Sequence, residues 1–188
     1  MFSRYSNLFD DCPIIAAVKD EAGLESCLQS ESRIVFVLFG NLCNIEEIVK
    51  RIKQADKTAI VHIDLITGLA AKEVAVDYIS RHTEADGIIS TKPALIKRAQ
   101  ELSLIAIQRF FLIDSIAFEN IIKQMETCRP DFVEVLPGTM PKIIRRLCTM
   151  ISAPVIAGGL ITDKEDIIAA LNSGAVAIST TNQSVWFM

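Results

Sequence analysis

Short apolar runs rich in β-branched residues recur along the chain, and each is followed by a longer stretch with the apolar spacing of an amphipathic helix. Runs this continuously apolar are typical of strands buried on both faces, as in parallel sheets. The predicted strands are residues 14–18, 34–39, 59–63, 87–89, 104–111, 132–136, 155–157 and 175–178. The predicted helices between them are residues 20–29, 45–55, 70–80, 93–101, 114–125, 141–150 and 162–171.

Strands that alternate with helices in this way indicate βα repetition, which builds either a closed barrel or a doubly wound open sheet. The even spacing of eight short strands favours an α/β fold with a single small (β/α)8 TIM-type barrel over residues 1–188. Residues 179–188 are too few for a full eighth helix, so we expect a truncated last helix. No linker or change of composition marks a second domain.

Charge and cysteine content exclude several classes of protein. The formal net charge of -4 argues against a strongly basic nucleic-acid-binding module. The five cysteines form no CxxC pair, and no Cys/His cluster has zinc-ligand spacing, so we predict no metal site and reduced thiols. Residues 1–11 lack a long apolar core, and no apolar run approaches the roughly 20 residues of a membrane span. We therefore expect a cytoplasmic protein with no membrane partner.

Glycines and hydroxyl residues follow the last two predicted strands. Gly158 and Gly159 come after strand seven, and Thr180 and Thr181 come after strand eight. In (β/α)8 barrels the loops at these two strand ends commonly hold a phosphate, because glycine lets backbone N–H groups approach an anion and hydroxyls add donors. The pattern predicts a phosphate-binding site. The alternative is that the glycine pair serves only a tight turn.

Polar residues also end predicted strands three and four. His62 and Asp64 are two residues apart, which places them on the same face of a strand, and we expect both to point into the barrel. They contact a ligand, or they form a buried structural pair. Lys92, after strand four, either helps to hold an anion or is simply solvated.

Strands five and six carry charges at interior positions. Alternation sends only one of Gln108 and Arg109 into the lumen, and Arg109 suits a phosphate or a carboxylate. Glu134 faces the lumen as well, so we predict an interior charge network of Asp64, Arg109 and Glu134, since an unpaired buried acid is costly.

Helix ends and the C-terminal tail carry further signals. Asp114 is a predicted helix cap, and Thr162 with Glu165 forms a predicted capping box. The apolar tail Val185–Met188 is expected to dock on its own barrel, and a homo-oligomer contact is the alternative.

Motifs of common enzymes are absent. The chain has no P-loop, no GxGxxG after the first strand, no HExxH and no GxSxG elbow. No lysine occupies an obvious Schiff-base position within a strand. The residues therefore single out no catalytic group.

Six ordered motifs resemble one family over nearly the whole chain, from residue 12 to residue 186. They are VHIDLITGL at 61–69, GIIST at 87–91, AIQRFFLIDS at 106–115, DFVEVLPG at 131–138, AGGLI at 157–161 and GAVAISTTN at 174–182. Together they resemble the glycerol uptake operon antiterminators, which respond to glycerol 3-phosphate.

The resemblance implies a regulator rather than an enzyme, with no cofactor and with glycerol 3-phosphate as effector. It implies transcription antitermination on the leader mRNA of glycerol-utilisation genes, and therefore RNA binding. Asp64 and Glu134 would accept hydrogen bonds from glycerol hydroxyls, while the glycines and threonines hold the phosphate. The best RNA-contact residues lie on one predicted helix: Lys142, Arg145 and Arg146. Two other predicted helices carry rival basic groups: Lys97 with Arg98, and Lys50 with Arg51 and Lys53. The alternative for all three groups is that they are ordinary solvated helix faces.

Two other functions stay open on the residues alone. An isomerase, aldolase or lyase for a small phosphorylated substrate is suggested by the barrel and by the neighbouring His62, Asp64 and Glu134. A phosphate-ligand sensor that acts on a protein partner is the other.

Overall fold

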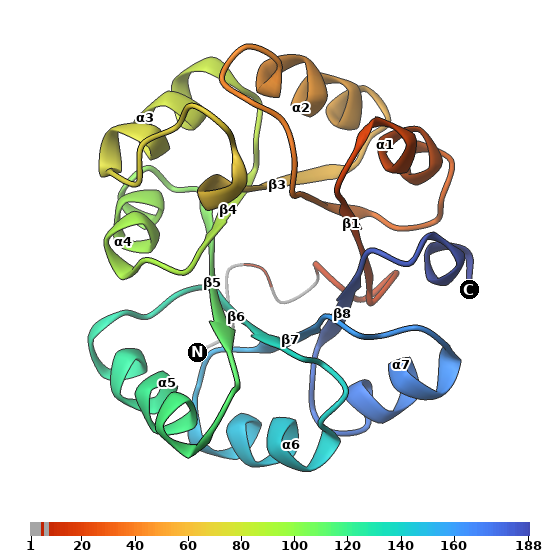
Figure 1. Cartoon of the computed structure of the whole chain (residues 1–188), viewed down its shortest axis with the longest axis vertical. Coiled ribbons are helices and arrows are strands. Elements are labelled where there is room, and N and C mark those ends of the chain that lie inside the picture. The colour runs from red at the N-terminus through yellow and green to blue at the C-terminus, as the bar shows by residue number, and fades with distance from the viewer. Residues whose placement is uncertain (1–4, 6–7) are drawn as a thin grey trace.

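Eight parallel strands form one closed barrel in the order β1 to β8, with β8 paired to β1, which confirms the predicted fold (Figure 1). This computed structural model describes Tyr5 and residues 8–188. The strands are β1 Ile14–Val18, β2 Ile34–Val37, β3 Thr58–His62, β4 Gly87–Ser90, β5 Ile105–Phe111, β6 Phe132–Leu136, β7 Val155–Gly158 and β8 Ala177–Thr180.

Helices form the outer ring, each crossing from one strand to the next (Figure 1). They are α1 Glu21–Leu28, α2 Ile45–Gln54, α3 Glu73–His82, α4 Pro93–Glu101, α5 Ser115–Thr127, α6 Pro141–Met150 and α7 Lys164–Leu171. Two short 3-10 helices complete the set: η1 Ile63–Leu65 after β3, and η2 Gln183–Phe187 after β8. The latter stands where an eighth helix would be, as the short remaining segment predicted.

Alternation along the strands divides the apolar core in two. Ile15, Phe36, Ile60 and Phe132 belong to a cluster inside the barrel, whereas their strand neighbours pack outward under the helices. Phe9 joins the inner cluster and meets Phe132 edge-on, with ring centroids 5.1 Å apart. Because Phe132 begins β6, this contact fills the N-terminal end of the lumen, and any ligand must enter from the other end.

The C-terminal tail docks partly on its own barrel. Val185 and Trp186 are buried, and the Trp186 indole Nε1 donates to the carbonyl oxygen of Thr180 at 2.9 Å. Phe187 and Met188 remain exposed.

Two details of the predicted elements change the placement of polar residues. β8 begins and ends two residues later than predicted, so Ser179 and Thr180 lie within the strand. β3 ends at His62, and the chain turns at once into η1, so Asp64 is not on the strand.

Caps of α5 and α7 test two further predictions. Asp114 caps α5 as expected, because its Oδ1 accepts from the Ala117 N–H at 2.8 Å. The capping box at α7 is wrong: Asp163 is the cap residue and accepts from the Asp166 N–H at 3.0 Å. Since the helix begins only at Lys164, Thr162 lies too far upstream and donates to the Asp166 carboxylate instead.

Within Tyr5 and residues 8–188, no helix has the length and apolar character that a membrane span requires. Residues 1–4 and 6–7, part of the segment predicted to lack a leader, lie outside the described residues.

Candidate functional site

The lumen is apolar through most of its height and ends in one polar layer towards the C-terminal ends of the strands. This layer is formed by the buried side chains of His62, Arg109, Glu134 and Ser179. They come from β3, β5, β6 and β8, so four separate strands converge on it. In this fold such a layer lies where ligands bind.

Glu134 is the centre of this layer and is fully buried. Its Oε2 accepts from Arg109 Nε at 2.5 Å, and its Oε1 accepts from the Ser179 hydroxyl at 2.5 Å. β5 and β6 pair Arg109 with Glu134 in register, which brings cation and anion onto neighbouring strands. The pairing removes the large cost of an isolated buried charge.

Arg109 enters the lumen, whereas Gln108 turns outward and donates to the Gln124 side chain on α5 at 2.8 Å. Strand alternation predicted that only one of the two would face inward. In the described part of the chain, Arg109 uses only Nε in hydrogen bonding. Its two terminal amino groups are therefore available to an anion at the mouth.

His62 is 3% exposed, and no residue that the structure describes hydrogen-bonds its Nδ1. Burial lowers the His62 pKa to about 4, and the positive charge of Arg109 adds to the effect. The imidazole is therefore neutral at pH 7. A buried polar nitrogen without a partner costs free energy, and a ligand or water hydroxyl at this position would remove that cost.

Asp64 does not join the predicted interior network, and that prediction is wrong for this residue. Because η1 turns the chain away from the strand direction, its carboxylate binds the β4–α4 loop, accepting from Ser90 Oγ at 3.0 Å and Thr91 N at 2.9 Å. Lys92 Nζ lies 3.0 Å from the other carboxylate oxygen. Burial raises the Asp64 pKa, but these hydrogen bonds outweigh it and lower the pKa below its usual value.

The two glycines have different structural roles. A Cβ on Gly158 would lie 2.6 Å from Ser179 Oγ and 2.7 Å from Glu134 Oε1, so only glycine leaves room for the polar layer. Gly159 has a φ of +74°, a left-handed conformation that favours glycine in the turn after β7.

The two threonines also differ. Thr180 is buried; its hydroxyl donates to the Ile161 carbonyl at 2.8 Å and accepts from the Asn182 N–H at 3.1 Å. It thus joins the loops after β7 and β8. Thr181 is exposed, just past the end of β8.

Ser179 takes part in the layer but was missed by the sequence analysis. β8 was expected to end at residue 178, so Ser179 was counted among loop residues. Once the strand extends to Thr180, alternation groups Ser179 with Ala177 of the inner cluster and separates it from Ile178 of the outer one.

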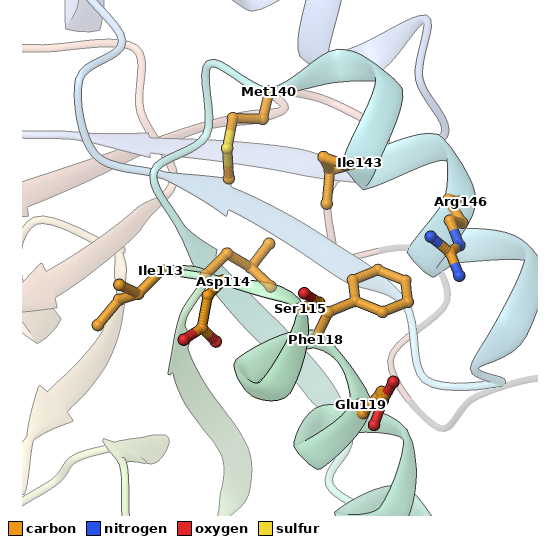
Figure 2. Close-up of a pocket in the computed structure, with 9 residues that line it drawn as sticks. Ile113, Asp114, Ser115, Phe118, Glu119, Met140, Ile143 and Arg146 are labelled. Carbon is orange, nitrogen blue, oxygen red and sulfur yellow. The ribbon is translucent and has the colours of Figure 1, made fainter.

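A hollow lies outside the barrel wall, between α5 and α6 (Figure 2). It measures about 380 Å³, and its walls are formed by Leu112, Ile113, Asp114, Ser115, Phe118, Glu119, Met140, Ile143 and Arg146. The Arg146 guanidinium lies 4.7 Å from the centroid of the Phe118 ring. The other predicted RNA-contact residues, Lys142 and Arg145, are exposed on the same helix.

Among Tyr5 and residues 8–188, no three His, Cys, Asp or Glu side chains group in a way that would hold a metal ion.

Comparison with known proteins places the whole barrel in one family. The family model for the glycerol-3-phosphate responsive antiterminator matches residues 14–186. An uncharacterized protein of Escherichia coli K12, YgcP, is 49% identical over 174 residues, which cover 93% of this chain and 91% of that protein.

Solved structures agree with this match. The glycerol uptake operon antiterminator regulatory protein of Listeria monocytogenes is 32% identical, with a TM-score of 0.91 and coverage of 95% of this chain and 96% of that one. A glycerol uptake operon antiterminator-related protein of Thermotoga maritima is 35% identical, with a TM-score of 0.81 and coverage of 93% and 98%. A deoxyribose phosphate aldolase of Aeropyrum pernix, 14% identical with a TM-score of 0.69 and coverage of 93% and 87%, shares the fold alone. The chain therefore belongs to the family of glycerol-3-phosphate responsive antiterminators.

Proposed function

We propose that this protein senses glycerol 3-phosphate in the mouth of its barrel and, in the cytoplasm, acts on the leader mRNA of glycerol-utilisation genes to prevent transcription termination. The observation that carries the proposal is the polar layer. Among the described residues, Arg109 hydrogen-bonds only through Nε and His62 Nδ1 has no partner, and both side chains belong to the polar layer that ends an otherwise apolar lumen.

The chemistry of the layer fits a small phosphorylated polyol. The guanidinium of Arg109 matches the geometry of phosphate oxygens and is always charged. The neutral imidazole of His62 pairs with a hydroxyl as donor or acceptor, depending on its tautomer. Gly159 and Thr181 lie at the two loops that commonly hold phosphate in this fold. Glu134 positions Arg109 and Ser179, and Asp64 positions the β4–α4 loop.

The buried lysine lies away from the proposed ligand site. Within the described residues, Lys57 is the buried lysine, and its Nζ donates to the carbonyl oxygens of Ser30 and Ser32 at 2.7 Å each. Those residues precede β2, at the end of the barrel opposite the polar layer. A Schiff base at Lys57 would therefore form far from any substrate in the mouth.

Calorimetry with glycerol 3-phosphate and with glycerol tests the ligand. We expect glycerol 3-phosphate to bind at least about tenfold more tightly, because Arg109 contacts its phosphate. Equal affinity for the two compounds, or no binding of either, would overturn the proposal. A panel of sugar and triose phosphates incubated with the protein should remain unchanged; turnover of one of them would favour an enzyme.

A further inference from the structure

We propose that the solvent face of α6, together with the pocket between α5 and α6, is the surface that binds the leader RNA. Three cations, Lys142, Arg145 and Arg146, would contact phosphates, and the pocket would take one unpaired base. This inference rests on the proposed function, because it names the surface through which the antiterminator reaches its RNA. We call these three side chains the α6 surface.

On each of the two rival basic helices, ion pairs engage some of the cations and leave only Lys50 and Lys97 without an acid among the described residues. On α2, Lys53 pairs with Asp86 at 2.7 Å and Arg51 pairs with Glu21 at 2.9 Å. On α4, Arg98 pairs with Asp77 at 2.6 Å.

On α6 the charges stay free. In the part of the chain that the structure describes, no acid lies in ion-pair distance of Lys142, Arg145 or Arg146. Among the described residues these three side chains make one hydrogen bond, and it is long: Arg145 donates to the Asn172 carbonyl at 3.4 Å. The α6 surface thus keeps its positive charge for an outside partner.

The positive charge is also concentrated in sequence and in space. Between residues 135 and 162 the chain has no acidic residue and has these three basic ones, although the whole protein carries a net charge of -4. Positions 142, 145 and 146 are spaced i, i+3 and i+4, which places the three side chains on one face of the helix. A row of cations on an otherwise acidic molecule is complementary to a phosphate backbone.

The adjoining pocket has the features of a base-binding site. RNA-binding proteins read single-stranded bases by stacking them on aromatic rings or guanidinium planes and by hydrogen-bonding their edges. The guanidinium carbon of Arg146 lies 4.7 Å from the centroid of the Phe118 ring, and Ile113 is 85% exposed at the rim (Figure 2). Asp114 and Glu119 supply acceptors for the amino group of a base.

The strands beneath the pocket carry the proposed ligand site. β5 bears Arg109 and leads directly into Leu112 and Ile113 of the pocket wall. β6 bears Glu134 and leads towards Met140 on the opposite wall, and the Leu112 N–H donates to the Leu136 carbonyl at 2.7 Å. Glycerol 3-phosphate bound at Arg109 therefore lies at the base of both walls, and we expect it to strengthen RNA binding.

The test measures fluorescence anisotropy of a labelled RNA hairpin followed by a run of uridines, the form of an intrinsic terminator, and of the natural leader transcript. One variant carries Lys142→Gln, Arg145→Gln and Arg146→Gln. Its charge-matched control carries Lys50→Gln, Arg81→Gln and Lys97→Gln. These three residues are exposed on α2, α3 and α4, away from α6, and form no ion pair with any residue that the structure describes (Figure 1). Calorimetry with glycerol 3-phosphate confirms that each variant is folded.

We expect the α6 variant to lose about tenfold or more in affinity, and its dependence of log K on log salt to become shallower by about two units. The control should change little in either measure. Equal losses in both variants, or none in either, would overturn the α6 surface while the proposed function stands. A wild-type protein that binds glycerol 3-phosphate but neither RNA, with or without ligand, would overturn the proposed function and this surface together.

A second pair of matched variants tests whether the pocket binds a base. Arg146→Lys keeps the charge but loses the planar group, whereas Arg145→Lys makes the same change beside α7, outside the pocket. We expect Arg146→Lys to weaken RNA binding at least about threefold with an unchanged salt slope, and Arg145→Lys to bind as wild type. Identical behaviour of the two would show that α6 contacts phosphates only and would overturn the base pocket.

Discussion

Arg109 on β5 and Glu134 on β6 are partners in the strand register, and Nε of the arginine lies 2.5 Å from Oε2 of the glutamate. The pair stands in a lumen that is apolar below it, and Ser179 takes the second carboxylate oxygen. Stability and the proposed ligand response thus depend on the same few atoms. Substitutions in and around the layer can separate these two roles.

Removing one member of the pair should destabilise the protein more than removing both. Arg109→Met leaves Glu134 as a buried, unbalanced charge, and we expect the free energy of unfolding to fall by about 3–5 kcal/mol. The double variant Arg109→Met with Glu134→Leu should recover much of that loss, and urea denaturation measures both. A double variant as unstable as the sum of the single ones would contradict this account of the layer.

A methyl group at position 158 should disturb the same layer. Gly158→Ala places a Cβ within 2.7 Å of Ser179 Oγ and Glu134 Oε1, and we expect a loss of about 1–3 kcal/mol. Adding Ser179→Ala removes the nearer of the two clashing oxygens and should restore part of the stability. If thermal unfolding shows Gly158→Ala to be neutral, the layer is less tightly packed than the distances indicate.

Stability should depend on pH through His62. The folded state holds the His62 pKa at about 4, while the unfolded chain has the ordinary value near 6.5. Between these values the unfolded state binds the extra proton, so stability falls as the pH drops from about 6.5 to 4, by up to about 3 kcal/mol. His62→Gln should lose this slope, which urea unfolding at a series of pH values measures. Parallel curves for wild type and variant would contradict the prediction.

Replacing Asp64 should lower the stability of the protein, through the β4–α4 loop, more than it lowers the affinity for the ligand. Asp64→Asn loses the charge that holds Ser90, Thr91 and Lys92, and we expect about 1–2 kcal/mol of destabilisation. The affinity for glycerol 3-phosphate should stay within about threefold of wild type, because the carboxylate is already engaged. Asp77→Asn, which breaks a surface pair with Arg98, is the matched control. A large loss of affinity at Asp64 alone would mean that it contacts the ligand after all.

The tail should stabilise its own barrel rather than a dimer. Ending the chain at Ser184 removes the buried Trp186 and its hydrogen bond, and we expect a loss of about 3–5 kcal/mol. The number of chains per particle, measured as mass in solution, should not change. Phe187→Ser with Met188→Ser, which alters only the exposed end, should leave both stability and mass as in wild type. Fewer chains per particle in either variant than in wild type would show an oligomer contact at this end.

Local patterns were enough for the architecture. The alternation of apolar runs with amphipathic stretches predicted all eight strands in order and the short last helix, because burial on both faces of a parallel strand leaves a continuous apolar signature. Alternation within a strand predicted that only one of Gln108 and Arg109 enters the lumen, and the structure shows that it is Arg109. Both inferences depend on the period of one strand, which the amino-acid order contains.

Local patterns in the sequence could not predict which distant residues pair. Asp64 left the lumen because a 3-10 turn follows His62, and Ser179 entered it because β8 extends two residues further than its apolar run. The three basic helices looked alike until Asp86 and Asp77, each at least 21 residues from its partner, neutralised cations on α2 and α4 but none on α6. The order of residues determined the strands, the helices and the inward faces, since these depend on local periodicity. Barrel closure and loop geometry determined which charges meet, since an ion pair requires two distant segments to lie within a few ångströms.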